Sequence, residues 1–195
     1  RVMQCDIVLA GVGGQGILSI ATILDRVALK EGLSLKQAEV HGMAQRGGAV
    51  QSHLRFSDEP IASDLIPRGG ADLILSVEPM EAIRYLDFLK PDGAVVSSAS
   101  PFVNIPNYPP IEEVLGALRE VKNHVLVDTR ALAKEAGNAR AENTVMLGAA
   151  SPFLPLPEQR IADEIAAAFA AKGEKVVEAN RKAFLLGRDA SLARA

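Results

Sequence analysis

The sequence lacks tryptophan and contains a single cysteine, Cys5, among its 195 residues. One thiol cannot form a disulfide within the chain, and it cannot supply the four thiolates that usually hold an iron–sulfur cluster. Aromatic residues make up only 4% of the chain, so no platform for stacking single-stranded nucleic acid is evident. These absences exclude a disulfide scaffold and a self-contained iron–sulfur protein.

An excess of positive charge is also missing. The formal net charge is −3, which gives no basic footprint, so nucleic acid is not an expected partner. No apolar run approaches the roughly 18 residues that span a membrane, and no signal peptide opens the sequence. We therefore expect a cytoplasmic protein with no membrane partner.

Short apolar runs recur along the chain and predict strands that are buried on both faces. The second of these runs has the weakest pattern. The expected strands are Asp6–Ala10, Leu35–Val40, Leu73–Val77, Ala94–Ser97 and His124–Val127.

Helical spacing of apolar residues fills the gaps between the expected strands. It predicts one helix that ends near Lys30, a second over Met80–Leu89 behind Pro79, and a third that starts at Ile111. From about Asn143 the chain reads as a C-terminal helical section. The alternation indicates an α/β protein with a Rossmann-like, doubly wound, mostly parallel sheet. We expect residues 1–195 to form a single domain.

A further strand is expected at Ala49–Arg55, where apolar and polar residues alternate. This pattern predicts that Gln51, His53 and Arg55 lie on one solvent-facing side. The histidines are not spaced as a metal site, and His124 is expected to be structural. No metal ligand is assigned to this chain.

The most recognisable motif is the run Gly11-Val12-Gly13-Gly14-Gln15-Gly16, which follows a strand and opens a helix. Such glycines allow a tight turn and a close backbone approach to a phosphate. The helix dipole contributes only about 1 kcal/mol to anion binding. The cofactor-binding candidates are therefore assigned to a turn for either a phosphate or a subunit interface, namely Gly11, Gly13, Gly14, Gln15 and Gly16.

A dinucleotide-binding protein would also need an acid about 20 residues after the glycines, to contact a ribose hydroxyl. Glu39 is the nearest candidate. A free-standing NAD(P)- or FAD-binding Rossmann protein is therefore the alternative function. A purely structural assembly module is a third interpretation.

The segment that follows Glu39 is the most unusual part of the chain. Glycines give its backbone conformational freedom, and Arg46 offers a planar fork to a carboxylate or phosphate. We interpret it as a loop for a partner or ligand, formed by His41, Gln45, Arg46, Gly47 and Gly48.

Other polar residues are expected to have structural roles. Glu78 and Asp128 follow strands and are expected to cap the next helices. Cys5 precedes a strand and is expected to be buried rather than nucleophilic. Asp92-Gly93 follows Pro91 and is expected to form a turn rather than part of a thiamine diphosphate motif. No catalytic residue is assigned.

The two glycine segments together closely resemble the gamma domain of 2-oxoacid:ferredoxin oxidoreductases. The matching stretches span about three quarters of the chain in the family's order. They are GVGGQGI at Gly11–Ile17, EVHGMAQRGGAVQSHLR at Glu39–Arg55, DLILSVE at Asp72–Glu78 and NTVMLG at Asn143–Gly148.

The resemblance implies a subunit that is inactive alone. The family's enzymes oxidatively decarboxylate a 2-oxoacid to an acyl-CoA and reduce ferredoxin. A lone gamma domain of this length is most similar to the beta subunits of indolepyruvate ferredoxin oxidoreductases, and pyruvate-type gamma subunits remain open. The implied partners are a large alpha subunit and ferredoxin. Thiamine diphosphate, magnesium, iron–sulfur clusters and CoA are implied to act through the partner subunit.

Overall fold

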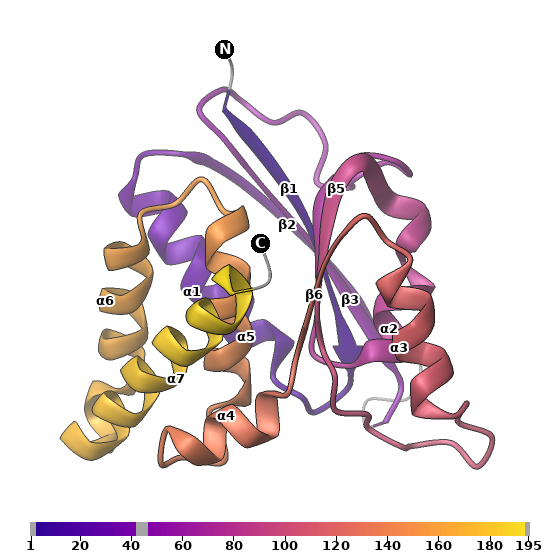
Figure 1. The fold of residues 1–195 in the computed structure, drawn as a ribbon. Coiled ribbons are helices and arrows are strands. Elements are labelled where there is room, and N and C mark those ends of the chain that lie inside the picture. The colour runs from indigo at the N-terminus through magenta and orange to yellow at the C-terminus, as the bar shows by residue number, and fades with distance from the viewer. Residues whose placement is uncertain (1–2, 42–46, 194–195) are drawn as a thin grey trace.

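The structure is a computed structural model that describes residues 3–41 and 47–193 (Figure 1). Its centre is a sheet with the strand order β2-β3-β1-β4-β5-β6. The strands are β1 (Gln4–Val12), β2 (Ser34–His41), β3 (Ala49–Ser57), β4 (Ala71–Ser76), β5 (Leu89–Ser98) and β6 (Asn123–Val127).

Strand direction fixes which loops can meet. β1, β4, β5 and β6 are parallel neighbours, whereas β3 is antiparallel to both β1 and β2. The carboxyl ends of the parallel strands therefore lie at one edge of the sheet, together with the beginning of β3. The expected mostly parallel, doubly wound sheet is confirmed, with β3 as the reversed strand.

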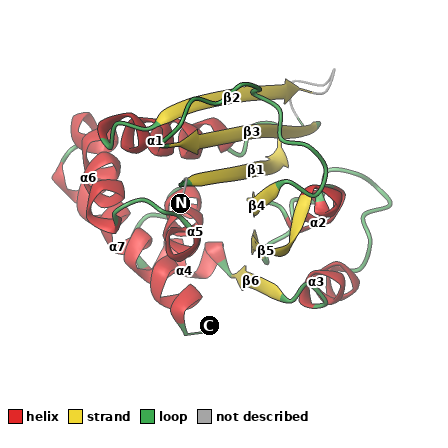
Figure 2. Ribbon diagram, turned by 90° about the horizontal axis from the view of Figure 1, so that it is seen from above, coloured by secondary structure: helices red, strands yellow, loops and turns green. Residues whose placement is uncertain are grey.

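Helices cover both faces of the sheet. In Figure 2, α1, α5, α6 and α7 lie on one side of the strands, and α2 and α3 lie on the other. Successive residues of β1 point to opposite faces. Accordingly, Ile7 and Leu9 belong to the larger apolar cluster under the four helices, and Val8 belongs to the smaller cluster under α2 and α3. The helices are α1 (Ile17–Lys30), α2 (Pro79–Arg84), α3 (Ile111–Arg119), α4 (Thr129–Glu135), α5 (Glu142–Ala150), α6 (Glu158–Phe169) and α7 (Glu174–Leu192).

Two local predictions between β4 and β5 are wrong. The helix expected over Met80–Leu89 stops at Arg84, because Leu89 pairs with Ala71 in the sheet and begins β5. The turn expected at Asp92-Gly93 lies inside β5, where the pairing with β4 changes register. Tertiary pairing overrides the local signal in both cases.

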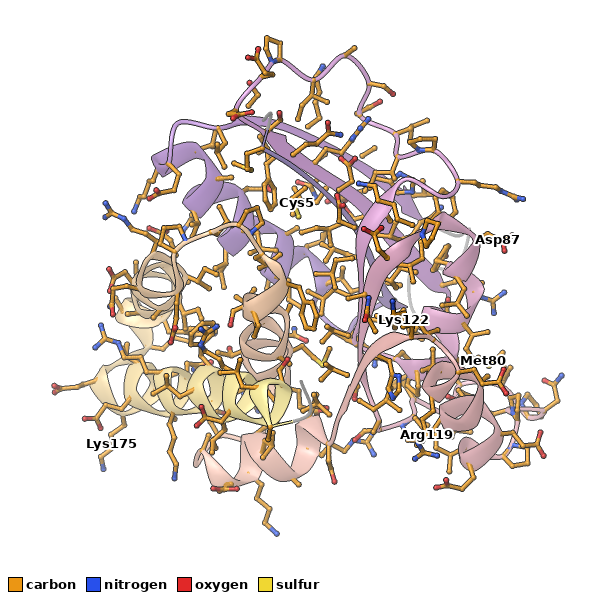
Figure 3. All side chains as sticks on the ribbon, turned by 45° about the horizontal axis from the view of Figure 1, so that its top comes forward. Cys5, Met80, Asp87, Arg119, Lys122 and Lys175 are labelled. Carbon is orange, nitrogen blue, oxygen red and sulfur yellow. The ribbon has the colours of Figure 1, made fainter. Side chains whose placement is uncertain are left out.

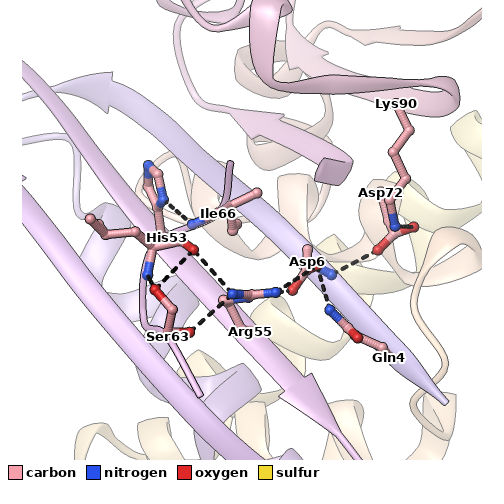
Figure 4. A network of polar contacts seen from close by, with 9 residues as sticks. Gln4, Asp6, His53, Arg55, Ser63, Ile66, Asp72 and Lys90 are labelled. Atoms are coloured by element: carbon pink, nitrogen blue, oxygen red, sulfur yellow. Dashed lines mark hydrogen bonds and ion pairs between the residues drawn. The ribbon is translucent and has the colours of Figure 1, made fainter. Parts of the chain in front are cut away.

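The prediction that one side of β3 faces solvent is also wrong. His53 is only 4% exposed, and its Nδ1 accepts a hydrogen bond of 2.9 Å from the amide of Ile66. Arg55 Nε donates to Asp6 Oδ1 at 2.7 Å, and Arg55 Nη1 donates to the carbonyl of Ser63 at 3.0 Å (Figure 4). The segment 58–70 therefore packs over this face and covers it. Gln51, the third residue of the set, is half-buried.

The expected C-terminal helical section is present, and its α5 is buried on all sides. α5 packs against α7 through two facing glycines, Gly148 and Gly187. A Cβ atom on Gly148 would lie 2.0 Å from the carbonyl oxygen of Phe184, so the two backbones are in direct contact. None of the helices in the described part of the chain combines the length and the apolar character needed to cross a bilayer.

Candidate functional site

The candidate site lies at the carboxyl edge of the parallel strands, where open α/β sheets bind ligands. Five loops meet around this edge. They are residues 13–16 after β1, 47–48 before β3, 77–78 after β4, 99–110 after β5, and the connection 128–141 from β6 to α5, which contains α4.

The glycine turn after β1 is closed by its own glutamine. The amide of Gln15 donates to the carbonyl of Val12 at 3.0 Å, and Gln15 Oε1 accepts from the amide of Val12 at 2.7 Å. Gly14 and Gly16 have φ angles of +99° and +77°, which side chains rarely adopt. Gly13 and Gly14 leave the turn with no side chain over its backbone.

Two of the motif glycines allow close packing. A Cβ atom on Gly11 would lie 2.5 Å from Val77 Cγ2, so Gly11 lets β1 approach the end of β4. A Cβ atom on Gly16 would lie 2.5 Å from Asn143 Nδ2. That amide donates to the carbonyls of Gln15 and Gly16, at 2.9 and 3.1 Å. Asn143 therefore joins the beginning of α5 to the turn.

The structure brings the two glycine segments together. The amide of Gly13 donates to the carbonyl of Gly48 at 2.8 Å, and the amide of Gly47 donates to the carbonyl of Gly13 at 3.4 Å. Asn104 Nδ2 donates to the carbonyl of Gly47 at 2.5 Å. Of the other loop residues, His41 ends β2, whereas Gln45 and Arg46 lie outside the described residues.

Glu78 organises the loop 99–110 beside these glycines. Its side chain is buried, and its Oε2 accepts from the amide of Glu81 at 2.9 Å, so the expected helix cap is confirmed. Its Oε1 also accepts from the amide of Phe102 at 3.2 Å and from the hydroxyl of Tyr108 at 2.6 Å. Burial, together with this hydrogen bond to a carboxylate, raises the pKa of Tyr108. The loop role of Glu78 was not predictable, because its partners are 24 and 30 positions away.

A pocket of about 310 Å³ lies between this loop and the beginning of α5. Arg130 Nη2 donates to the carbonyl of Pro101 at 3.0 Å, and Thr129 Oγ1 donates to Glu142 Oε2 at 2.8 Å. Asp128 accepts from the amide of Ala131 at 3.0 Å, which confirms its expected cap of α4. Guanidinium and amide groups suit a polar or anionic ligand. The lining includes Gln15, Phe102, Arg130, Arg140, Glu142 and Asn143.

Metal-ligating side chains do not gather at this edge in the part of the chain that the structure describes. In residues 3–41 and 47–193, no set of three or more His, Cys, Asp and Glu side chains is arranged around a metal position. Cys5 is the second residue of β1, at the opposite end of that strand from the glycine turn, and it is buried, as expected (Figure 3). Burial and the carboxylates of Asp72 and Asp6 raise its pKa, so it remains a thiol.

The acid expected for a dinucleotide site is displaced from the glycine turn. Glu39 lies on the edge strand β2 opposite Ser52 of β3, and Ser52 lies opposite Leu9 of β1. The antiparallel strand β3 therefore separates Glu39 from β1 by about 10 Å, two strand spacings. In the dinucleotide-binding fold the strand with the acid is the direct neighbour of the first strand.

Exposed apolar side chains surround the same edge. Leu18 follows the glycine turn, and Phe102 and Val103 form the outer part of the loop 99–110. Val103 is the most exposed of these, at 67%. A second pocket of about 300 Å³ connects the turn to Leu18 and Val50. Apolar surface next to a preformed turn is typical of an interaction surface.

Comparisons with known proteins agree on one family. Residues 6–190 match the family model for pyruvate ferredoxin/flavodoxin oxidoreductase. The chain is 39% identical over 194 residues to the indolepyruvate oxidoreductase subunit IorB of Pyrococcus horikoshii, and the match covers 94% of each chain.

Two solved structures have a similar fold. The gamma subunit of a keto/oxoacid ferredoxin oxidoreductase from Geobacter sulfurreducens has a TM-score of 0.68 at 24% identity, over 97% of this chain and 99% of that one. The 2-oxoglutarate:ferredoxin oxidoreductase of Magnetococcus marinus has a TM-score of 0.78 at 24% identity. The match covers 97% of this chain and 31% of the Magnetococcus chain.

Proposed function

Because this chain belongs to the pyruvate ferredoxin/flavodoxin oxidoreductase family, we propose that it is the small subunit of an indolepyruvate-type 2-oxoacid:ferredoxin oxidoreductase. The observation that carries the proposal is the end-to-end match with the Pyrococcus subunit, which leaves no large segment unmatched in either chain. Residues 1–195 then act as one gamma-type domain. The relatives reported above are oxidoreductase subunits and give no support to the free-standing dinucleotide-binding alternative.

The chain's own chemistry supports a helper role. Its one cysteine is buried and does not fit an iron–sulfur cluster, which needs several accessible thiolates. Carbanion and electron-transfer chemistry belongs to cofactors, so a partner that holds thiamine diphosphate, magnesium and iron–sulfur clusters must supply it. The expected partner is a large alpha subunit, and ferredoxin accepts the electrons from the complex.

The carboxyl edge of the parallel strands, with its glycine turn, is proposed as the surface that contacts the large subunit. The exposed apolar side chains of Leu18, Phe102 and Val103 lie there, beside the joined segments that contain Gly13 and Gly47. In the Magnetococcus relative the same fold is part of a chain about three times longer, so the fold also occurs joined to a larger protein. We assign the turn to the interface, because the amides of Val12 and Gly13 already donate to Gln15 Oε1 and the Gly48 carbonyl, and Asn143 binds the carbonyls of the turn.

The test is an anaerobic pull-down of the tagged full-length chain from its native cells. A large thiamine-dependent iron–sulfur protein should be recovered with it, and the complex should reduce ferredoxin with arylpyruvates faster than with pyruvate or 2-oxoglutarate. Val103→Glu should lower partner recovery at least tenfold. The control Leu185→Glu, at another exposed apolar position, on α7, should not. Turnover by the isolated chain with added cofactors would contradict the proposal.

A further inference from the structure

A further concave surface lies between α1 and the 3₁₀ turn Ala170–Lys172 that follows α6, and it adjoins the candidate site, because Arg140 and Asn143 line both the 310 Å³ pocket and this surface. It consists of two adjoining hollows of about 200 and 290 Å³. Both hollows are lined by Ser19, Ile23, Phe169 and Lys172, so they form one groove. Arg140 lines the first hollow and Arg26 lines the second.

The groove is positively charged although the protein is acidic overall. Arg26, Arg140 and Lys172 contribute three cationic side chains to its lining, and no carboxylate lines either hollow. Within the described ranges 3–41 and 47–193, none of these three side chains makes an ion pair.

On the neighbouring surface, cationic side chains form ion pairs with carboxylates. At the other end of α1, Lys30 pairs with Glu164 of α6, and Arg160 Nε lies 3.1 Å from Glu31 Oε1. Lys30 of α1 and Arg160 of α6, which lie outside the groove, are therefore each paired with a carboxylate. Each hollow therefore has two cations without an ion-pair partner among the described residues, Lys172 with Arg140 in the first and Lys172 with Arg26 in the second, and a bound anion would reduce the repulsion between them.

The walls of the groove also suit a small molecule rather than a flat surface. Phe169 is half-buried and lines both hollows, and the Lys172 ammonium lies 5.2 Å from the centre of its ring. Ser19 adds an exposed hydroxyl on the α1 side. An apolar wall with a few convergent polar groups is the usual construction of a small-ligand site.

We propose that this groove binds a small phosphate-bearing anion of nucleotide size. Arg140, before α5, offers a guanidinium group to phosphate oxygens in the first hollow, and Arg26 of α1 offers one in the second, while Lys172 adds a point charge to both. The two hollows together approach the size of a small-ligand pocket. Binding there would tie α1 to the 3₁₀ turn after α6 and to the loop that carries Arg140.

The test measures binding of two probes, ADP and inorganic pyrophosphate, to the full-length chain by calorimetry at low salt. Both probes should bind, and Arg26→Gln and Lys172→Gln should each weaken ADP binding at least tenfold. The matched control is Lys175→Gln, because Lys175 projects from the beginning of α7 and lines neither hollow (Figure 3). It should leave ADP binding within twofold. These side chains are exposed, so the variants should keep the parent's melting temperature.

The result also separates phosphate from other anions. Binding of pyrophosphate but not ADP would overturn a ligand of nucleotide size and leave a site for the phosphate group alone. The proposal is overturned if neither probe binds at 5 mM. That concentration would detect even a weak site with a binding free energy of about −4 kcal/mol. ADP binding that the two variants leave unchanged would overturn the proposal too. Tighter binding of an oligo-glutamate peptide than of ADP would reassign the groove to an acidic protein segment and also overturn it.

Discussion

Asn143 donates its side-chain amide to the carbonyl of Gln15, 128 positions earlier in the chain, across 2.9 Å. A second hydrogen bond from the same amide reaches the carbonyl of Gly16 at 3.1 Å. The first turn of the fold is therefore held by a residue that belongs to its C-terminal helical section. Three of the four predictions below depend on contacts of this kind between distant segments.

Asn143→Ala should lower the free energy of unfolding by about 1–2 kcal/mol, because two half-buried carbonyls lose their donor. Urea unfolding at neutral pH measures the change. Asn107→Ala, at an exposed position in the loop 99–110, is the control and should cost less than about 0.5 kcal/mol. Equal losses for both variants would contradict the role of Asn143.

Gly16→Ala should destabilise the chain by more than conformational strain alone. Gly16 and Gly69 have similar φ angles of +77° and +70°, but a Cβ atom meets Asn143 Nδ2 at Gly16 and nothing within 4 Å at Gly69. Gly69→Ala should therefore cost about 1–2 kcal/mol, the penalty of a left-handed backbone, and Gly16→Ala should cost more. The double variant Gly16→Ala/Asn143→Ala should cost less than the sum of its single changes. Additivity in urea unfolding would show that the two positions do not interact.

Alanine substitutions at two helical glycines should change the free energy of unfolding in opposite directions. A methyl group on Gly148 would lie 2.0 Å from the Phe184 carbonyl oxygen, so Gly148→Ala should cost at least about 3 kcal/mol and separate α5 from α7. Gly116 in α3 has open space around its Cβ position, so Gly116→Ala should stabilise by about 0.5–1 kcal/mol. Thermal unfolding of both variants tests the pair. A stabilised Gly148→Ala protein would mean that the helices do not touch there.

Asp25 should make stability depend on pH. Its Oδ1 is buried without a hydrogen-bond partner in the described part of the chain, and burial, followed by the charge of Glu39, raises its pKa from 3.8 to about 6. The folded state thus holds the proton more tightly than the unfolded state. The contribution of Asp25 is most favourable below pH 3.8 and is lost as the pH rises toward 6.

Asp25→Asn should therefore stabilise the chain at pH 7, by about 1 kcal/mol once the shift is discounted for the solvent that reaches this half-buried group. At pH 4 the gain should disappear. Unfolding curves for parent and variant at the two pH values check this. A gain of equal size at both pH values would indicate an effect other than ionisation.

Much of the fold was predictable because its signals are local. The strands Asp6–Ala10 and His124–Val127 are apolar runs that need burial on both faces, and they lie within β1 and β6. The caps at Glu78 and Asp128 follow from carboxylate side chains at strand-to-helix junctions. In each case the residues that decide the outcome are neighbours in sequence.

The remaining features depend on segments that are far apart. His53 and Arg55 alternate with apolar residues, as the residues of a solvent-facing side would, but the segment 58–70 covers them. That segment has no periodic pattern in its sequence. α5 shows no apolar stripe because every side of it is buried. The groove with Arg26 and Lys172 joins elements that are separated by about 150 positions, and nothing local to either element signals it.

The contact of Asn143 with the glycine turn also has a consequence for synthesis. A chain that has emerged from the ribosome through β4 already contains both glycine segments, so β1, β2 and β3 can pair while the rest is being made. The amide that binds the turn's carbonyls arrives only with α5. Until then the edge that we assign to the large subunit has its strands paired but lacks the hydrogen bonds from Asn143. A partner that recognises the final shape of this edge will therefore bind the finished chain in preference to the nascent one.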